Sequence, residues 1–187
     1  MILVDVAART LTLGAKTLGC TIGRHGACPA AEKREGDGRT PLGNWPIRGV
    51  LLRRDRVTLP AGLCLPWRWI APEDGWSDDV RDPAYNRAVR HPHPYRAERL
   101  WHADGLYDVI VLLGHNDDPP VPGLGSAIFL HCRNGDHPTE GCVALDRREL
   151  LAILPSLTPG MRLSITDPAA KNVCRPDAMS AGHDEVP

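Results

Sequence analysis

The sequence predicts a mostly β domain with one or two short helices and a long inserted loop. Gly and Pro are both frequent, with 18 residues of each, whereas Phe occurs once. Such a composition favours short strands joined by many turns over a helical bundle. The chain has 187 residues, of which 42% are apolar and 24% charged. These values are typical of a soluble globular protein with one hydrophobic core.

Apolar–polar alternation predicts several strands in the first half of the chain. The segment ILVDVAARTLTL (2–13) alternates around a turn, which predicts a β-hairpin, and LGCTIGRHG (18–26) predicts a further strand. The segment EGDGRTPLGNWPI (35–47) indicates a Gly/Pro/Asp turn followed by a short aromatic strand. Two more short strands, bounded by prolines, are expected within residues 56–76.

The second half carries the strongest strand signal. LYDVIVLLGHN (106–116) predicts a core strand, and SAIFLH (126–131) predicts the next one. RRELLAILPSL (147–157) has apolar residues at helical spacing, and Asp146 precedes it as an N-cap. MRLSIT (161–166) predicts a closing strand.

Residues 77–104 interrupt this pattern. They are rich in Asp, Pro, Arg and His and lack a clear periodicity. We expect a long irregular loop that covers a site as a lid. We therefore expect one domain over residues 1–167, and a flexible polar tail over residues 168–187.

Charge and hydrophobicity exclude two classes of partner. The formal net charge is −1, so we expect no binding to nucleic acid. The first residues, MILVDVAARTLTLG, include an acid and have neither a basic cluster nor a long apolar run. We interpret them as a strand rather than a signal peptide, and expect no stable membrane insertion.

The stretch AIFLHCRNGDHPTEGCVAL (127–145) brings cysteine and histidine close together. A strand, a loop and a returning strand can place His131 beside Cys142, where the imidazole can take the thiol proton and create a nucleophile. Gly141 would let the backbone approach a substrate and present N–H groups to an oxyanion. The general alternative is that the cysteines are buried small apolar residues, which we favour for Cys132.

Zinc is the second alternative for this stretch. Zinc sites use closely spaced pairs of ligands, whereas the four candidates are scattered. Adjacent residues on a strand also point to opposite faces, so His131 and Cys132 are poorly placed to share an ion. We expect no metal and no cofactor. The four candidates are His131, Cys132, His137 and Cys142.

Two motifs resemble the L,D-transpeptidase catalytic domain (YkuD-like) family. SAIFLH and PTEGCVAL (138–145) resemble its apolar strand ending in His and its Ser/Thr-x-Gly-Cys motif. DGRTPLG (37–43) resembles its D-G-x-T-P-x-G turn. Two motifs in the family's order are more specific than either alone. The resemblance covers about residues 2–166 and implies a β-sandwich of mixed and antiparallel sheets.

The resemblance also implies roles for particular residues. Cys142 would be the nucleophile and His131 its general base, while Gly141 and the Cys142 amide would form the oxyanion hole. Thr139 would brace the loop. Two departures are Glu140, where the family often has His, and a shorter interval between His131 and the cysteine.

A third departure concerns substrate choice. Ala144 stands where the family usually has a basic residue that helps to form the substrate site. Arg133, Arg147 or Arg87 are candidates for a substitute charge. We also expect a substrate site that includes residues near the core strand and in the 77–104 segment, with His25, His91, His93 and His102 on the surface. The predicted binding residues are Thr139, Arg133, Tyr107, His115, Asn116, Tyr85, Arg87 and Trp101.

The activity implied by the resemblance is acyl transfer in peptidoglycan. The cysteine would attack the diaminopimelate carbonyl of a donor tetrapeptide stem, release D-Ala, and pass the acyl group to an amine, giving a 3-3 or 1-3 cross-link. Carbapenem-type inhibitors would acylate the cysteine. Such a reaction implies the periplasm or cell envelope. The alternatives are an L,D-carboxypeptidase, an amidase, a D-amino-acid exchange enzyme and a non-catalytic module that binds wall peptides.

Overall fold

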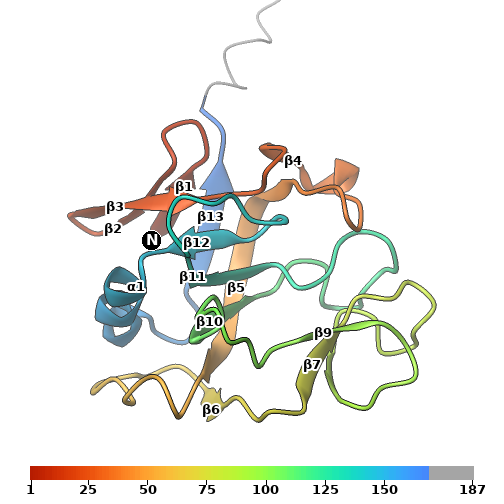
Figure 1. The fold of residues 1–187 in the computed structure, drawn as a ribbon. Helices are drawn as coiled ribbons and strands as arrows, with labels where there is room; N and C mark the ends of the chain where they lie inside the picture. The colour runs from red at the N-terminus through yellow and green to blue at the C-terminus, as the bar shows by residue number, and fades with distance from the viewer. Residues whose placement is uncertain (169–187) are drawn as a thin grey trace, which may run out of the picture.

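A 13-residue strand, β5 (Thr40–Leu52), connects the two halves of the fold. The computed structural model describes residues 1–168. The first part of β5 pairs with β13 (Arg162–Thr166), and its second part pairs with β10 (Val109–Leu113). Figure 1 shows β5 as a long arrow through the middle of the molecule.

The main sheet closes on itself through these pairings. From β10 it continues through β11, β12, β3, β2 and β1 to β13, and both ends of this path pair with β5. β4 and β6 add to β5 as parallel strands. The remaining strands of this sheet are β1 (Ile2–Asp5), β2 (Thr10–Leu13), β3 (Lys16–Thr21), β4 (Ala27–Pro29), β6 (Trp67–Trp69), β11 (Phe129–Cys132) and β12 (Val143–Leu145).

The predicted mostly β class with mixed pairing is confirmed. β1 and β2 form the expected hairpin, whereas β11 and β12 run parallel. The alternation of side chains divides β11 between two cores. Leu130 and Cys132 join the main core, and Phe129 joins a smaller cluster on the other face. Cys132 is therefore a buried core residue, as the sequence predicts.

A short helix covers one edge of the main core. α1 (Arg147–Ile153) packs against β10 and β11 and continues into the 3-10 helix η2 (Leu154–Ser156). A second 3-10 helix, η1 (Ala30–Glu32), follows β4. Asp146 is the N-cap, and its carboxylate accepts hydrogen bonds from the Arg148 amide at 2.8 Å and the Glu149 amide at 3.4 Å. The predicted helix and cap are confirmed.

The 77–104 segment is more regular than the sequence predicts. It contributes β8 (Ala88–Arg90) and β9 (Ala97–Arg99), which flank β7 (Asp74–Ser77) in a separate antiparallel sheet. Figure 1 shows β7 and β9 on the side of the molecule away from α1. Strands of three residues are too short for their alternation to be recognised in a sequence.

Asn86 connects this insert to the rest of the domain. Its side-chain amide donates to the carbonyls of His115 and Asn116, at 3.1 and 2.7 Å. Its Oδ1 accepts from Trp76 Nε1 at 2.9 Å and from the Ala127 amide at 3.1 Å. The insert is thus held by buried hydrogen bonds as well as by its own strands.

Two further expectations concern the chain ends and membranes. The predicted flexible tail begins at residue 168, so almost all of it lies outside the described residues. Within residues 1–168, no helix has the length and apolar character needed to span a bilayer.

Candidate active site

A cavity of about 770 Å³ lies between the insert and the strands β11 and β12. The loop before β5, strand β9, the loop before β10 and the loop between β11 and β12 all contribute to its wall. The residues that matter most for its chemistry are Lys33, Glu35, Glu98, Tyr107, His131 and Cys142.

Strand register places Cys142 and His131 on the same face of the sheet. β11 and β12 run parallel, with His131 beside Ala144. Phe129 lies two residues before His131, and Cys142 lies two residues before Ala144. Residues two apart along a strand share a face. The Phe129 amide accordingly donates to Cys142 Sγ at 3.3 Å. Cys142 and His131 both line the cavity.

The thiol of Cys142 is bonded to the main chain rather than to the imidazole. Its S–H donates to the carbonyl oxygen of Ala127 at 3.1 Å. Ala127 has φ +52°, a left-handed conformation that is uncommon for a residue with a side chain. Within residues 1–168, no hydrogen bond joins Cys142 Sγ to His131. Proton transfer between them requires the S–H to turn away from Ala127.

The position of His131 defines which nitrogen can act as a base. Nδ1 lies 2.7 Å from the Cys132 carbonyl oxygen, which can only accept a hydrogen bond. Nδ1 therefore carries the proton, and Nε2 is the basic nitrogen. The ring meets the edge of Tyr107 with centroids 5.2 Å apart.

Burial keeps both members of the pair neutral. It lowers the pKa of His131 to about 4 and raises the pKa of Cys142 to about 12. In a low-dielectric site the charged forms of both groups are disfavoured. The resting pair at neutral pH is thus a thiol and a neutral imidazole, not a thiolate and an imidazolium.

Thr139 makes two hydrogen bonds within the loop that leads to Cys142. Its Oγ1 donates to the Cys142 carbonyl at 2.7 Å and accepts from the Gly141 amide at 3.2 Å. The Gly141 amide is therefore already bonded, and it must leave Thr139 to serve an oxyanion. Gly141 has φ +136°, and an added Cβ would lie 2.9 Å from the Arg39 carbonyl oxygen. Only glycine fits this position without strain.

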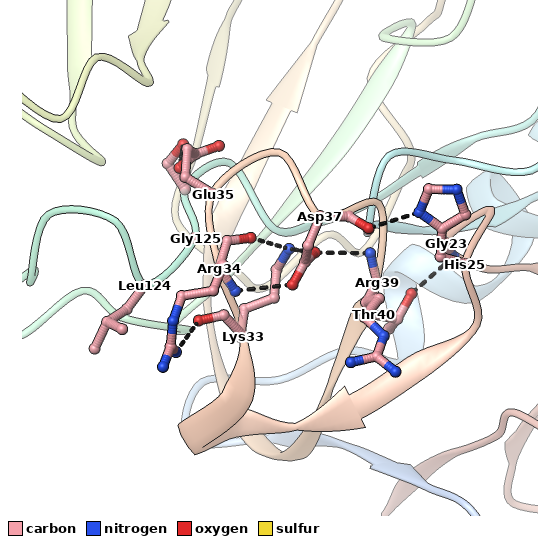
Figure 2. A network of polar contacts seen from close by, with 12 residues as sticks. Gly23, His25, Lys33, Arg34, Glu35, Asp37, Arg39, Thr40, Leu124 and Gly125 are labelled. Carbon is pink, nitrogen blue, oxygen red and sulfur yellow. Dashed lines mark hydrogen bonds and ion pairs between the residues drawn. The ribbon is translucent and has the colours of Figure 1, made fainter.

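The DGRTPLG motif (37–43) also supports the loop that leads to Cys142. Thr40 Oγ1 accepts from the Gly23 amide at 2.8 Å and donates to the Cys142 carbonyl at 3.4 Å. The turn before it is built around Asp37, as Figure 2 shows. The Asp37 carboxylate accepts from the amides of Arg34 and Arg39, each at 2.8 Å, and from Lys33 Nζ. The two motifs, distant in sequence, therefore form one structural unit around Cys142.

Three of the predicted binding residues line the cavity: Thr139, Arg133 and Tyr107. Arg133 pairs with Asp136 at 2.7 Å. The Tyr107 hydroxyl donates to Glu98 Oε1 at 2.7 Å. Ala144 stands where the family usually has a basic residue, and three arginines were considered as substitutes for its charge. Of these three, Arg133 alone lines the cavity. Arg147 pairs with Asp108, and Arg87 donates to the Asp117 carbonyl.

The other predicted binding residues lie outside the cavity wall. His115 is buried, with Nε2 3.0 Å from the Leu124 carbonyl oxygen. Asn116 bonds to the carbonyls of Val121 and Gly125, both at 2.9 Å, and closes its own turn.

Tyr85 and Trp101 also have structural contacts. Tyr85 is buried and donates to the cavity residue Glu35 at 2.5 Å, but it does not line the cavity itself. Trp101 lies under the guanidinium of Arg53, 3.6 Å from the ring centroid.

The cavity residues that were not identified from the sequence include Lys33, Glu35, Glu98 and His102. Lys33 and Glu35 flank the Asp37 turn, so their nearness to that motif was an available signal. Glu98 and His102 come from the insert, where no pattern distinguishes them. His102 was expected on the surface, but it is partly buried and packs edge-on against Tyr107, with ring centroids 4.8 Å apart.

The metal alternative has no support in this geometry. Cys132 faces the main core, away from the cavity that His131, His137 and Cys142 share. Among the described residues, no group of three or more His, Cys, Asp or Glu side chains is arranged to hold a metal ion.

Residues 1–165 match the family model of YkuD, the L,D-transpeptidase catalytic domain. The chain belongs to this family. The match covers the closed sheet, the insert and both motifs around Cys142, so the resemblance seen in the sequence is confirmed. No curated protein matches the chain.

Solved structures that match the chain include L,D-transpeptidases of Mycobacterium tuberculosis. L,D-transpeptidase 3 is 12% identical with a TM-score of 0.42, and the match covers 89% of this chain and 60% of that one. L,D-transpeptidase 1 is 12% identical with a TM-score of 0.39, over 88% of this chain and 60% of that one. A complex of L,D-transpeptidase 3 with a faropenem-derived adduct is 12% identical with a TM-score of 0.41, and the match covers 89% of this chain and 59% of that one. The YkuD-family chain thus spans about 60% of the length of these proteins.

Proposed function

We propose that this protein is a peptidoglycan L,D-transpeptidase with Cys142 as nucleophile and His131 as general base. The observation that carries the proposal is their placement on one face of β11 and β12, in the wall of a single cavity. A buried thiol and a basic imidazole nitrogen on the same face are the groups that cysteine acyl transfer needs.

The neutral resting pair determines how the reaction would begin. As Sγ attacks the diaminopimelate carbonyl, the thiol proton passes to His131 Nε2, so a free thiolate need not accumulate. The resulting tetrahedral intermediate collapses with cleavage of the C–N bond. His131 then gives the proton to the departing D-Ala amine, leaving a thioester on Cys142.

The second half of the reaction reverses these proton movements. An acceptor amine attacks the thioester and loses its proton to His131, and the sulfur leaves and is protonated again. A diaminopimelate amine as acceptor gives a 3-3 link, and the alternative is another position of the stem, which gives a 1-3 link. Carbapenem-type inhibitors would follow the first half-reaction, with the β-lactam ring opened by Cys142.

The cavity suits a zwitterionic stem peptide. Glu35 and Glu98 place carboxylates on its wall, and Arg96 and Arg133 place cations there. Charged side chains of both signs can pair with the amino and carboxyl groups of a peptide stem. This substrate would place the protein in the periplasm or cell envelope.

Ala144 favours a second candidate, an L,D-carboxypeptidase or D-amino-acid exchange enzyme. The residue is buried at the cavity wall and brings no charge to it. If water or a free D-amino acid replaces the acceptor stem, the same thioester yields a tripeptide or an exchanged stem. A module that only binds wall peptides would need no thiol beside a basic imidazole.

The proposal is tested by incubating the protein with purified disaccharide-tetrapeptide and resolving the products by tandem mass spectrometry. Cross-linked dimers made by the wild type and not by Cys142→Ala would support the transpeptidase. Fragmentation would identify the acceptor amine. Tripeptide without dimers would move the assignment to the carboxypeptidase, and unchanged substrate with an unmodified protein would overturn both. A Cys64→Ala variant is the matched control, because Cys64 is an exposed cysteine outside the cavity wall.

A further inference from the structure

Lys33 brings a buried cation close to the nucleophile. Its side chain is 2% exposed and lines the same cavity as Cys142. Nζ lies 3.5 Å from the position that a Cβ on Gly141 would occupy, beside the backbone that leads into the cysteine. Figure 2 shows this side chain reaching from the loop before β5 toward the Asp37 turn.

No other cation of the cavity wall is buried in this way. Among the described residues, the wall carries two further cations, Arg96 and Arg133. Arg96 is exposed and pairs with Asp78 at 3.0 Å, and Arg133 pairs with Asp136. The strand that follows the nucleophile contributes only the methyl group of Ala144. Positive charge near Cys142 therefore comes from Lys33.

The pairing with Asp37 holds Lys33 without cancelling its charge. The carboxylate also accepts two backbone amides, so its negative charge is shared among three donors. Burial opposes ionisation of Asp37, but these hydrogen bonds outweigh it and lower its pKa. Lys33 Nζ makes a second hydrogen bond, to the Arg34 carbonyl at 3.0 Å. An ammonium has three donors, so these two partners do not use all of them.

The other charged and titratable groups around Cys142 act against an anion. Burial is the main cause that raises the pKa of Cys142, and the carboxylates of Glu98 on β9 and Glu140 in the cysteine's own loop raise it further. The Phe129 amide and the charge of Lys33 lower it. Burial raises the pKa of Tyr107, and His131 is neutral. None of these groups can stabilise negative charge on sulfur as a fixed cation does.

We propose that Lys33 is a positioning residue that stabilises, through space, the negative charge formed at Cys142 during acyl transfer. It lies too deep for extensive contact with a substrate, so its effect is electrostatic. A buried cation is effective in this role because its field is weakly screened. The proposal rests on the proposed function for its catalytic meaning, but the effect on the thiol can be measured without any turnover.

The test is the rate of iodoacetamide alkylation of Cys142 between pH 7 and 9, read by peptide-resolved mass spectrometry. The exposed Cys64 provides the internal reference. Lys33→Gln keeps polar contacts with Asp37 but removes the charge, and Lys33→Met is a second neutral variant should the first fail to fold. Alkylation by either folded variant is expected to slow about tenfold at each pH, equivalent to a rise of about one pKa unit. Lys33→Arg is expected to restore the rate.

A matched control removes a lysine far from the cavity. Lys16 is exposed on β3 and does not line the cavity, so Lys16→Met should alkylate as the wild type does. Wild-type rates in a folded neutral variant, or slowing in Lys33→Arg as well, would overturn the role of the charge. Faster labelling of the buried Cys132 would identify an unfolded variant. If the charge effect is present but no muropeptide is altered, the proposed function fails and the inference stands.

Discussion

Thr139 and Thr40 donate hydrogen bonds to the same atom, the carbonyl oxygen of Cys142, at 2.7 and 3.4 Å. They come from two different loops, one within the cysteine motif and one at the start of β5. The backbone of Cys142 is thus held from two directions. The DGRTPLG motif therefore helps to position Cys142, although the proposed nucleophile and base lie outside it.

Removing the Thr139 hydroxyl should impair the chemistry of Cys142 more than the fold. Thr139→Val keeps the shape of the side chain but loses the bonds to the Cys142 carbonyl and the Gly141 amide. Loss of about 1 kcal/mol of positioning corresponds to a five- to tenfold slower acylation by a carbapenem. The measurement is the rate of adduct formation by intact mass. Thr139→Ser should retain the wild-type rate, and equal rates for Val and Ser would contradict the bracing role.

Gly141 is expected to be the least replaceable glycine near the site. Gly141→Ala would combine a φ of +136° with a Cβ only 2.9 Å from the Arg39 carbonyl oxygen. We expect a loss of about 2–3 kcal/mol in the free energy of unfolding, measured with urea. Gly123→Ala is the control, since it has φ +87° and no heavy atom within 4 Å. It should cost about 1 kcal/mol, and equal losses in both variants would exclude the steric contribution.

Asn86 should be needed to hold the insert beside Ala127 and Cys142. Asn86→Ala leaves the Trp76 indole, the Ala127 amide and two carbonyls without this partner. We expect a loss of about 2–4 kcal/mol in unfolding free energy, because buried polar groups lose their hydrogen bonds. The rate at which a carbapenem acylates Cys142 in this variant should also fall. Asn86 holds the Ala127 amide, and the Ala127 carbonyl in turn accepts from the Cys142 thiol.

Two comparisons separate the causes in this case. Asn86 has φ +55°, a backbone conformation that strains alanine but not glycine. Asn86→Gly therefore avoids this strain but still lacks the four hydrogen bonds, and it should be destabilised as well. Asn44 is exposed, and Asn44→Ala should change stability little. A Gly variant as stable as the wild type would show that the hydrogen bonds contribute nothing.

The sequence predicted elements whose signal is local. The β1–β2 hairpin alternates regularly, and Asp146 directly precedes the helix that it caps. The length of β5 was not predictable, because Pro41, Gly43 and Pro46 look like breakers. In the structure this region is where β5 passes from its β13 and β4 partners to β10. β8 and β9 were missed because three-residue strands carry no periodicity.

The residues of the candidate site likewise divide into those that a local motif predicts and those that only tertiary contacts bring together. Cys142, His131 and Thr139 belong to one short motif, so the sequence could bring them together. Lys33 reaches them only because the turn around Asp37 folds against Gly141, a tertiary contact that no local pattern contains. Tyr85 and Arg87 were expected at the cavity because they are polar and lie in the insert, but their side chains face other loops.

The buried, neutral His131 should make the protein less stable in acid. Its pKa is lowered to about 4 in the folded state, while an unfolded histidine titrates near 6.5. As the pH falls below about 6.5, the unfolded chain binds a proton that the folded chain does not, so stability decreases until about pH 4 and is unaffected above pH 7. We expect His131 to account for a loss of about 2 kcal/mol between pH 7 and pH 4.5.

This contribution can be isolated by urea unfolding of the wild type and His131→Gln at both pH values. The variant lacks the titrating ring, so its loss of stability on acidification should be smaller by that amount. The pKa of His115 is also lowered by burial, and its contribution remains in both proteins and cancels in the comparison. Equal acid sensitivity of the two proteins would mean that His131 is charged or solvated in the fold. The neutral thiol–imidazole pair, and the proton transfer that starts from it, would then have to be replaced by an ion pair.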